Sequence, residues 1–145
     1  MEIRVTDRPG IEAGTRLRGP YAVISIRSPG RPAPRIPPTP NCLGILSLAF
    51  SDAEYPEAPD PPEIHPFTQA HAEKIWEFVE RLRDSVQGWV VHCEAGMNRS
   101  PAVAAALAEW FGQESTPYFR RYAPNLYVYR TLRRVLLGKS TQRRA

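Results

Sequence analysis

Three short apolar runs along the chain have the composition of buried strands. They cover residues 21–26 (YAVISI), 43–50 (LGILSLAF) and 89–93 (WVVHC), and turn residues flank each of them. Residues 2–5 (EIRV) predict a further strand. Because these runs are nearly continuous in apolar residues, we expect strands that are buried mostly on both faces, as in a parallel sheet.

Three other segments have the periodicity of helices. The first runs from residue 71 to residue 86, and Gly88 follows as a stop signal. Its apolar residues are Ala72, Ile75, Trp76, Val79, Leu82 and Val86. A second helix is predicted from Pro101 to about Phe111, with Ser100 as its N-cap. A third is predicted over about residues 125–137, and its apolar side contains Leu126, Tyr129, Leu132 and Leu136.

Strands that are separated by helices or long loops predict parallel pairing. We therefore expect a single α/β domain over residues 1–138, with a central, mostly parallel sheet of four or five strands flanked by helices. A short basic tail, residues 139–145, follows it. A chain of 145 residues that is 42% hydrophobic is large enough for one such core. Most of the sixteen prolines fall within residues 29–40 and 56–66, which predicts two loops.

The net charge of +4 comes mainly from the end of the chain, where no acidic residue follows Glu114. Anionic partners fit this charge, but the glycine and aromatic signature of nucleic-acid modules is absent, so no nucleic acid is predicted as a partner. Two cysteines are too few for a disulfide framework. The N-terminus does not resemble a signal peptide, and no apolar run is long enough for a bilayer. We expect a cytoplasmic monomer without a membrane partner.

Residues 92–100 (HCEAGMNRS) connect a predicted strand to a predicted helix. A loop at a helix N-terminus can aim successive backbone N–H groups at one point, and the helix dipole adds positive potential there. Gly96 permits a tight backbone path. The sequence therefore predicts a cradle for a tetrahedral anion such as phosphate. Its residues are Glu94, Ala95, Gly96, Met97, Asn98 and Arg99.

The side chains around this cradle suit phosphoryl transfer. Cys93 lies at its base, where the positive field favours a nucleophilic thiolate. The planar fork of Arg99 can hold two phosphate oxygens and stabilise the charge of the transferring group. Ser100 can donate a hydrogen bond to the sulfur and help it leave. We expect His92 to order the loop by hydrogen bonding.

The pattern His92-Cys93-x-x-Gly96-x-x-Arg99-Ser100 resembles the signature of the cysteine-dependent protein tyrosine phosphatases. The compact size is similar to that of their dual-specificity branch, as are the order and spacing of the strands, of the helix before residue 89 and of the Pro124-Asn125 pair. The resemblance implies a phosphatase-like fold, a phosphorylated protein as substrate and a loop-ordering role for Asn125. The proline-rich segment, residues 29–40, departs from that branch, in which many members carry a helix there.

Departure of an alkoxide or phenolate requires a proton, so a carboxylic acid must face the cradle. The candidates are Asp52, Glu54, Glu57, Asp60 and Glu63. Active residues of parallel sheets gather at the carboxyl ends of strands, and Asp52 follows one strand as the cradle follows another. We therefore prefer Asp52, with Asp60 and Glu54 next, and the resemblance implies the same choice. No cofactor is predicted, and no metal, because His65, His71 and His92 lack ligand spacing.

The leading hypothesis is a metal-independent phosphomonoester hydrolase that forms a cysteinyl-phosphate intermediate. Two alternatives remain: a catalytically inactive module that binds phosphorylated partners, and an RNA 5′-triphosphatase. The RNA 5′-triphosphatase is kept because some such enzymes have a similar loop with an Asn directly before the Arg, which is the position of Asn98 here. The preference between phosphotyrosine and phosphoserine or phosphothreonine stays open. Cys42, at the start of its strand, is not expected to form a disulfide with Cys93.

Overall fold

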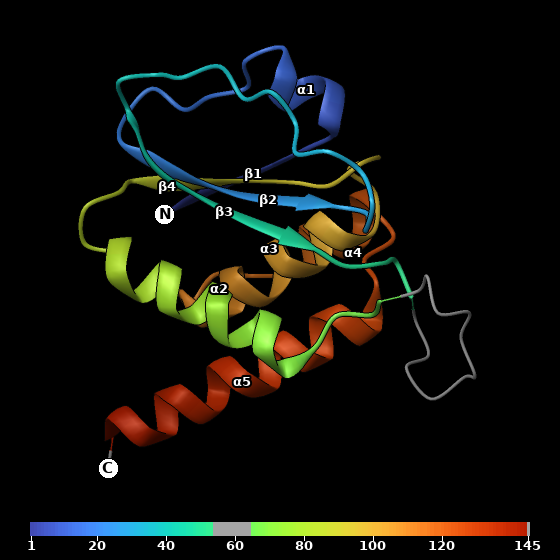
Figure 1. Ribbon diagram of the computed structural model, residues 1–145. Helices are drawn as coiled ribbons and strands as arrows, with labels where there is room; N and C mark the ends of the chain where they lie inside the picture. Colours follow the sequence, from blue (N-terminus) through green and yellow to red (C-terminus); the bar gives the residue numbers. More distant parts are fainter. Residues whose placement is uncertain (54–64, 145) are drawn as a thin grey trace.

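The centre of the molecule is a parallel β-sheet (Figure 1). The computed structural model describes residues 1–53 and 65–144. Within them the strands are β1 (Glu2–Thr6), β2 (Tyr21–Arg27), β3 (Cys42–Ala49) and β4 (Gly88–His92), in the order β1-β4-β2-β3. His92 is paired with Thr6 on one side and Ser25 on the other, so three strands end side by side. The predicted α/β fold with a parallel sheet is confirmed.

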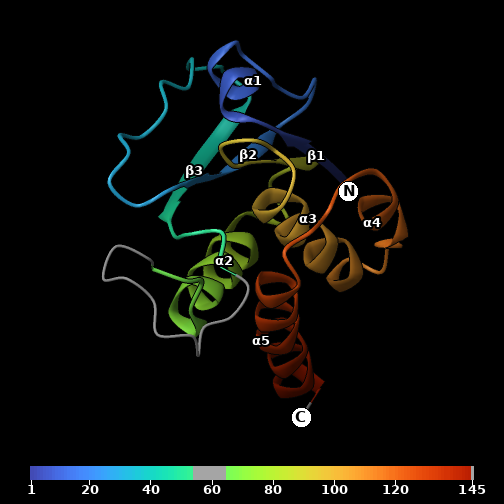
Figure 2. The same ribbon diagram turned by 90° about the vertical axis from the view of Figure 1, so that its right-hand side faces the viewer.

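Helices cover both faces of this sheet unequally. α2 (Gln69–Leu82), α3 (Arg99–Trp110) and α5 (Leu126–Arg144) lie on one face, and the short α1 (Arg8–Glu12) lies on the other (Figure 1). α4 (Thr116–Arg121) packs beside α3, near the edge formed by β1 (Figure 2). The main core fills the space between the sheet and the three long helices. A smaller core beneath α1 consists of Ile11, Leu17, Tyr21, Val23 and Val90.

The expectation of strands buried on both faces is confirmed for β2 and β4, and it is wrong for β3. Leu43 and Ile45 are 46% and 47% exposed, although the run that contains them is apolar except for Ser47 and Gly44. β3 lies at an edge of the sheet, and its packed face is the one toward α2. Position in the sheet, rather than local hydrophobicity, therefore determines how deeply this strand is buried.

The helix boundaries differ from the predicted ones at several points. α2 begins at Gln69 with Thr68 as its N-cap and ends at Leu82, before the predicted end at residue 86. α3 begins at Arg99, so Asn98 occupies the N-cap position and Ser100 lies inside the first turn. The prediction of Ser100 as the N-cap is therefore wrong. Its hydroxyl is directed to the Cys93 sulfur instead.

The last helix is longer than predicted, since α5 continues from Leu126 to Arg144. Leu126 was expected on its apolar side, but it is 46% exposed, and Val128 is buried instead. The reason is that α5 packs against both α2 and α3, which shifts the buried stripe around the helix. The division between a domain ending at residue 138 and a basic tail stays a prediction. The short helices α1 and α4 were not predicted.

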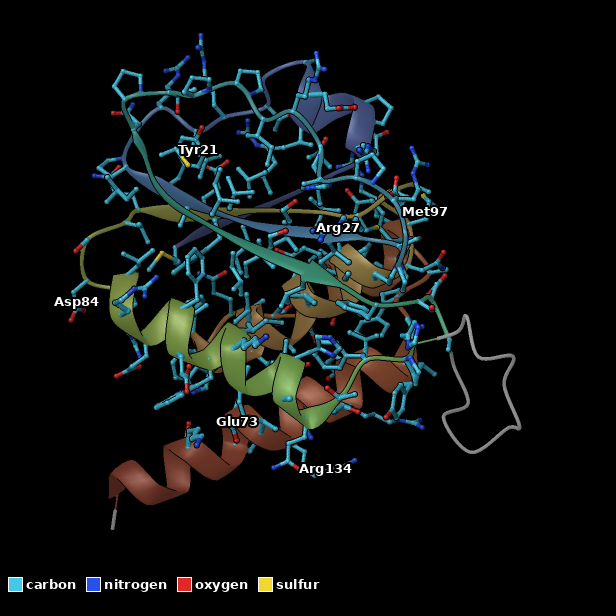
Figure 3. The ribbon with its side chains drawn as sticks, in the orientation of Figure 1. Tyr21, Arg27, Glu73, Asp84, Met97 and Arg134 are labelled. Atoms are coloured by element: carbon cyan, nitrogen blue, oxygen red, sulfur yellow. The ribbon has the colours of Figure 1, made fainter. Side chains whose placement is uncertain are left out.

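The two cysteines are free and belong to opposite ends of the sheet. Cys42 is paired with Tyr21, which is paired with Gly88 at the start of β4, whereas Cys93 follows the end of β4. Tyr21 accordingly lies far along the sheet from Arg27 and Met97 (Figure 3). The strand direction on which the disulfide prediction rested is confirmed. No helix in the described part of the chain is long and apolar enough to cross a membrane.

Candidate active site

Cys93 is buried directly after β4, at the carboxyl end of the sheet. Its Sγ accepts a hydrogen bond from the backbone N–H of Gly96 at 3.2 Å and lies 3.1 Å from the Oγ of Ser100. The N-terminus of α3 begins six residues later and adds the positive end of its dipole. The sulfur thus has one backbone N–H donor and lies within hydrogen-bond distance of a hydroxyl that can donate or accept.

In the predicted cradle, residues 94–99, several carbonyl groups are turned outward. Three of them accept backbone hydrogen bonds from outside the loop: Glu94 from Arg8 at 3.1 Å, Met97 from Ala123 at 3.1 Å, and Asn98 from Asn125 at 2.9 Å. In a trans peptide the N–H of the next residue points the opposite way. The N–H groups of Ala95, Asn98 and Arg99 therefore face the inside of the loop, as anion binding requires.

Gly96 is the one cradle residue with a positive φ, at 70°. A Cβ atom at this position would lie 3.0 Å from the carbonyl oxygen of Thr6, at the end of β1. Both the backbone conformation and the close approach to β1 therefore require glycine here.

Arg99 is buried, and its guanidinium is held by two strand ends. Its Nη1 donates to the carbonyl oxygen of Phe50 at 2.9 Å and to the Oγ of Ser28 at 3.0 Å. These bonds use both hydrogens of Nη1, so the edge formed by Nε and Nη2 is left for two oxygens of an anion. Ser28 was not predicted from the sequence, in which the one signal for it is its place directly after β2.

His92 is buried, and both nitrogens of its ring lie close to polar groups of the protein. Its Nε2 lies 2.6 Å from the Oγ of Ser25 on β2, and its Nδ1 lies 3.2 Å from the carbonyl oxygen of Cys93. Burial lowers the pKa of this imidazole below its ordinary value, which favours the neutral ring. The loop-ordering role of His92 stays a prediction, and Ser25 is a partner that the sequence did not reveal.

Asn125 connects the preferred acid to the cradle. Its Nδ2 donates to the Oδ1 of Asp52 at 2.7 Å and to the carbonyl oxygen of Ala53 at 3.2 Å. Its Oδ1 accepts from the N–H of Val128 and so caps α5, while its own N–H bonds to Asn98. Asp52 thus lies beside the cradle. The other candidate acids, Glu54, Glu57, Asp60 and Glu63, lie outside the described residues.

The polar side chains of Glu94 and Asn98 bond to groups outside the cradle. The carboxylate of Glu94 accepts from Arg8 at 3.1 Å, and the Nδ2 of Asn98 donates to the carbonyl oxygen of Ala123 at 2.6 Å. The side chain of Met97 is exposed at the carboxyl end of the sheet (Figure 3). These residues can therefore contact an anion through their backbone N–H groups, and Glu94 does not face it.

Among residues 1–53 and 65–144, no group of three His, Cys, Asp or Glu side chains is arranged as metal ligands. His71 has a different role, because its Nδ1 accepts from the backbone N–H of Thr68 and completes the capping box of α2. This contact gives His71 a structural role at the start of α2.

Comparison with known proteins gives a result only at the level of structure. No protein-family model and no curated protein matches the sequence. The structure is similar to that of human DUSP28, with a TM-score of 0.60 and 20% identity over 97% of this chain and 94% of that chain. It is also similar to the structure of human tyrosine phosphatase-like serine/threonine/tyrosine-interacting protein. The TM-score is 0.51, with 20% identity over 88% of this chain and 80% of that chain.

A third similar structure is that of a mouse protein described as a dual specificity phosphatase complexed with zinc tungstate. Its TM-score is 0.52, with 23% identity over 86% of this chain and 73% of that chain. Identities this low show a common fold and no more. The resemblance found in the sequence is thus confirmed by the architecture: this chain has the fold of the dual-specificity phosphatases.

Proposed function

We propose that the protein is a metal-independent cysteine phosphatase that hydrolyses phosphomonoesters of proteins through a cysteinyl-phosphate. One observation carries this proposal: the Cys93 sulfur accepts the Gly96 N–H and touches the Ser100 hydroxyl at the base of a loop whose N–H groups face inward. The tungstate in the mouse structure supports it, because tungstate is a tetrahedral oxyanion like phosphate.

In the first step the Cys93 thiolate attacks phosphorus. The S–P bond forms, the bond between phosphorus and the substrate oxygen breaks, and Asp52 gives its proton to that oxygen. The free edge of Arg99 and the inward N–H groups hold the non-bridging oxygens, on which the charge is spread. The protein contributes mainly fixed donors, because the loop and Arg99 are held in place before substrate binds.

In the second step water attacks the phosphorus of the cysteinyl-phosphate. Asp52, now a carboxylate, takes the proton from this water, and the S–P bond breaks. The Ser100 hydroxyl, 3.1 Å from the sulfur, donates to the departing thiolate and stabilises it. The hydrogen bond of Asp52 to Asn125, whose backbone N–H bonds to Asn98 of the cradle, supports this role.

A phosphorylated side chain is the substrate we favour. The cradle contains no lysine and only one arginine, Arg99, whereas a ligand with several phosphates needs more cations to replace its hydration. The preference for phosphotyrosine over phosphoserine or phosphothreonine is left to measurement. A cytoplasmic location and a monomeric state remain predictions.

The test is turnover of a nitrophenyl phosphate in excess chelator by the wild-type protein and by the Cys93→Ser variant. We expect metal-independent turnover that Cys93→Ser abolishes, while calorimetry still detects binding of vanadate or phosphate to the variant. Turnover that survives in the variant would exclude the covalent mechanism. Oxyanion binding without turnover in the wild type would instead support a phosphate-binding module, and a clear preference for 5′-triphosphorylated RNA would support the RNA 5′-triphosphatase.

A further inference from the structure

A buried arginine ties the cradle to the proline-rich segment, residues 29–40. Arg8, the first residue of α1, donates from Nη1 to the Glu94 carboxylate at 3.1 Å and from Nη2 to the carbonyl oxygen of Pro32 at 2.8 Å. Its backbone N–H also bonds to the carbonyl of Glu94. Because Glu94 directly follows Cys93 in the chain, this guanidinium connects the segment to the residue next to the reacting sulfur.

The same contacts place a second, accessible arginine at the edge of the site. The Nη1 of Arg31 lies 3.5 Å from the other carboxylate oxygen of Glu94, and the Arg31 side chain is 56% exposed. This separation is longer than the roughly 2.8 Å of a tight charge-assisted hydrogen bond. Glu94 is the one ion-pair partner of Arg31 within the described residues. The pair thus orients Arg31 and leaves most of its fork open to solvent.

In sequence, the chain around Arg31 carries charge of a single sign, although in space the segment also contacts the carboxylates of Glu12 and Glu94. Residues 13–51 include five arginines and no acidic residue. Arg27, at the end of β2, is one of them, and it lies at the same end of the sheet as Met97 of the cradle (Figure 3). The prolines limit the conformations of the segment, so a ligand group that binds there meets a largely pre-organised surface.

We propose that Arg31 determines specificity by binding an anionic group on the residues that flank the phosphorylated side chain. The group is a carboxylate or a second phosphate, since both match the planar fork of arginine. This inference rests on the phosphatase function proposed above and adds a substrate class to it. The interaction is partly exposed to solvent, so its effect is modest, about two- to fivefold in kcat/KM.

The experiment compares phosphotyrosine peptides whose flanking residues are alanines, glutamates, lysines or a second phosphothreonine. Each protein's kcat/KM for a charged peptide is divided by its value for the alanine peptide, so that general losses of activity cancel. The variants are Arg31→Ala and Arg31→Glu. The matched control is Arg35→Ala, an exposed arginine of the same segment that contacts Glu12 through its backbone N–H only.

We expect the wild-type protein to favour the glutamate and phosphothreonine peptides by about two- to fivefold. Arg31→Ala should remove this preference, Arg31→Glu should reverse it toward the lysine peptide, and Arg35→Ala should retain it. The preference should also shrink in high salt. The proposal would be overturned if the wild type and Arg31→Glu had the same kcat/KM ratios for charged over alanine peptides. It would also be overturned if Arg35→Ala lost the preference as fully as Arg31→Ala, because the positive charge of the whole segment, rather than Arg31, would then be the cause.

A binding measurement separates this inference from the catalytic proposal. The affinities of the same peptides are measured for Cys93→Ser and for Cys93→Ser combined with Arg31→Glu. A preference for acidic flanks that Arg31→Glu reverses would support the role of Arg31 even if the wild type hydrolysed none of the peptides. If the peptides bind without any dependence on residue 31, the role of Arg31 is wrong while the catalytic proposal stands on its own turnover test.

Discussion

The carboxamide of Asn125 holds the carboxylate of Asp52 beside the anion cradle, with 2.7 Å between Nδ2 and Oδ1. Asn125 is buried and caps α5, so its orientation is fixed by the helix. The backbone N–H of the same residue bonds to the carbonyl of Asn98 in the cradle. One residue therefore sets the position of the proposed acid relative to the proposed phosphate site.

Replacing Asp52 with asparagine should slow substrates with poor leaving groups far more than substrates with good ones. Only a poor leaving group needs a proton in the transition state, and general acid catalysis contributes about 10²- to 10⁴-fold. The measurement is kcat/KM for an alkyl phosphate and for a nitrophenyl phosphate, over a range of pH. An equal loss on both substrates would assign the acid to another carboxylate.

Removing the Asn125 side chain should also slow substrates with poor leaving groups, but less than Asp52→Asn does. Asn125→Ala loses the bonds to Asp52 and to the N–H of Val128, so we expect both a lower rate on the alkyl phosphate and a lower melting temperature. Combining Asp52→Asn with Asn125→Ala tests whether the two residues act together. The rate losses should be less than multiplicative, and multiplicative losses would contradict the positioning role.

Ser28→Ala should weaken oxyanion binding without unfolding the protein. The change removes one of the two acceptors of Arg99 Nη1, and a hydrogen bond to a charged group contributes about 1.5–3 kcal/mol. Vanadate affinity should fall by about tenfold or more, measured by calorimetry. Ser28→Thr keeps the hydroxyl and should restore most of the affinity. Unchanged affinity in Ser28→Ala would show that the Phe50 carbonyl alone orients Arg99.

Two glycines with positive φ make a matched pair for testing the cradle. Gly112 has a φ of 79° and open space around it, whereas Gly96 has a φ of 70° and a backbone oxygen 3.0 Å from the position of a Cβ. Gly112→Ala should therefore cost only the backbone strain, about 1–2 kcal/mol. Gly96→Ala should cost more in urea unfolding and should also abolish vanadate binding. Similar stability losses and retained binding would contradict the close packing against β1.

Stability should decrease on acidification because His92 is buried in its neutral form. Burial lowers the pKa of His92 in the folded protein. Below about pH 6.5 the unfolded chain therefore binds more protons than the folded protein does. The unfolding free energy should therefore fall with pH, by at most about 1.4 kcal/mol per pH unit for this group. In His92→Gln the slope should be smaller but not zero, because burial also lowers the pKa of His71. Equal slopes in urea unfolding between pH 7.5 and pH 5 would refute this assignment.

The sequence by itself determined those features that depend on neighbouring residues. The succession of strand, loop and helix around Cys93 lies in one continuous stretch, and the apolar runs of β2 and β4 identify strands that are covered on both faces. The choice of Asp52 followed from its place directly after a strand, whereas the role of Asn125 was implied only by the resemblance; both roles stay predictions. Such features are visible in a sequence because residue type, spacing and capping act locally.

Only the tertiary structure decided which distant groups meet at the site. Ser28 and Phe50 hold Arg99, Ser25 bonds to His92, and Arg8 joins Glu94 to the proline-rich segment. Each contact joins residues far apart in the chain, and each depends on the order β1-β4-β2-β3, which brings particular strand ends together. The exposure of Leu43 has the same origin, because hydrophobicity does not specify which strand lies at an edge, whereas the assembled sheet does.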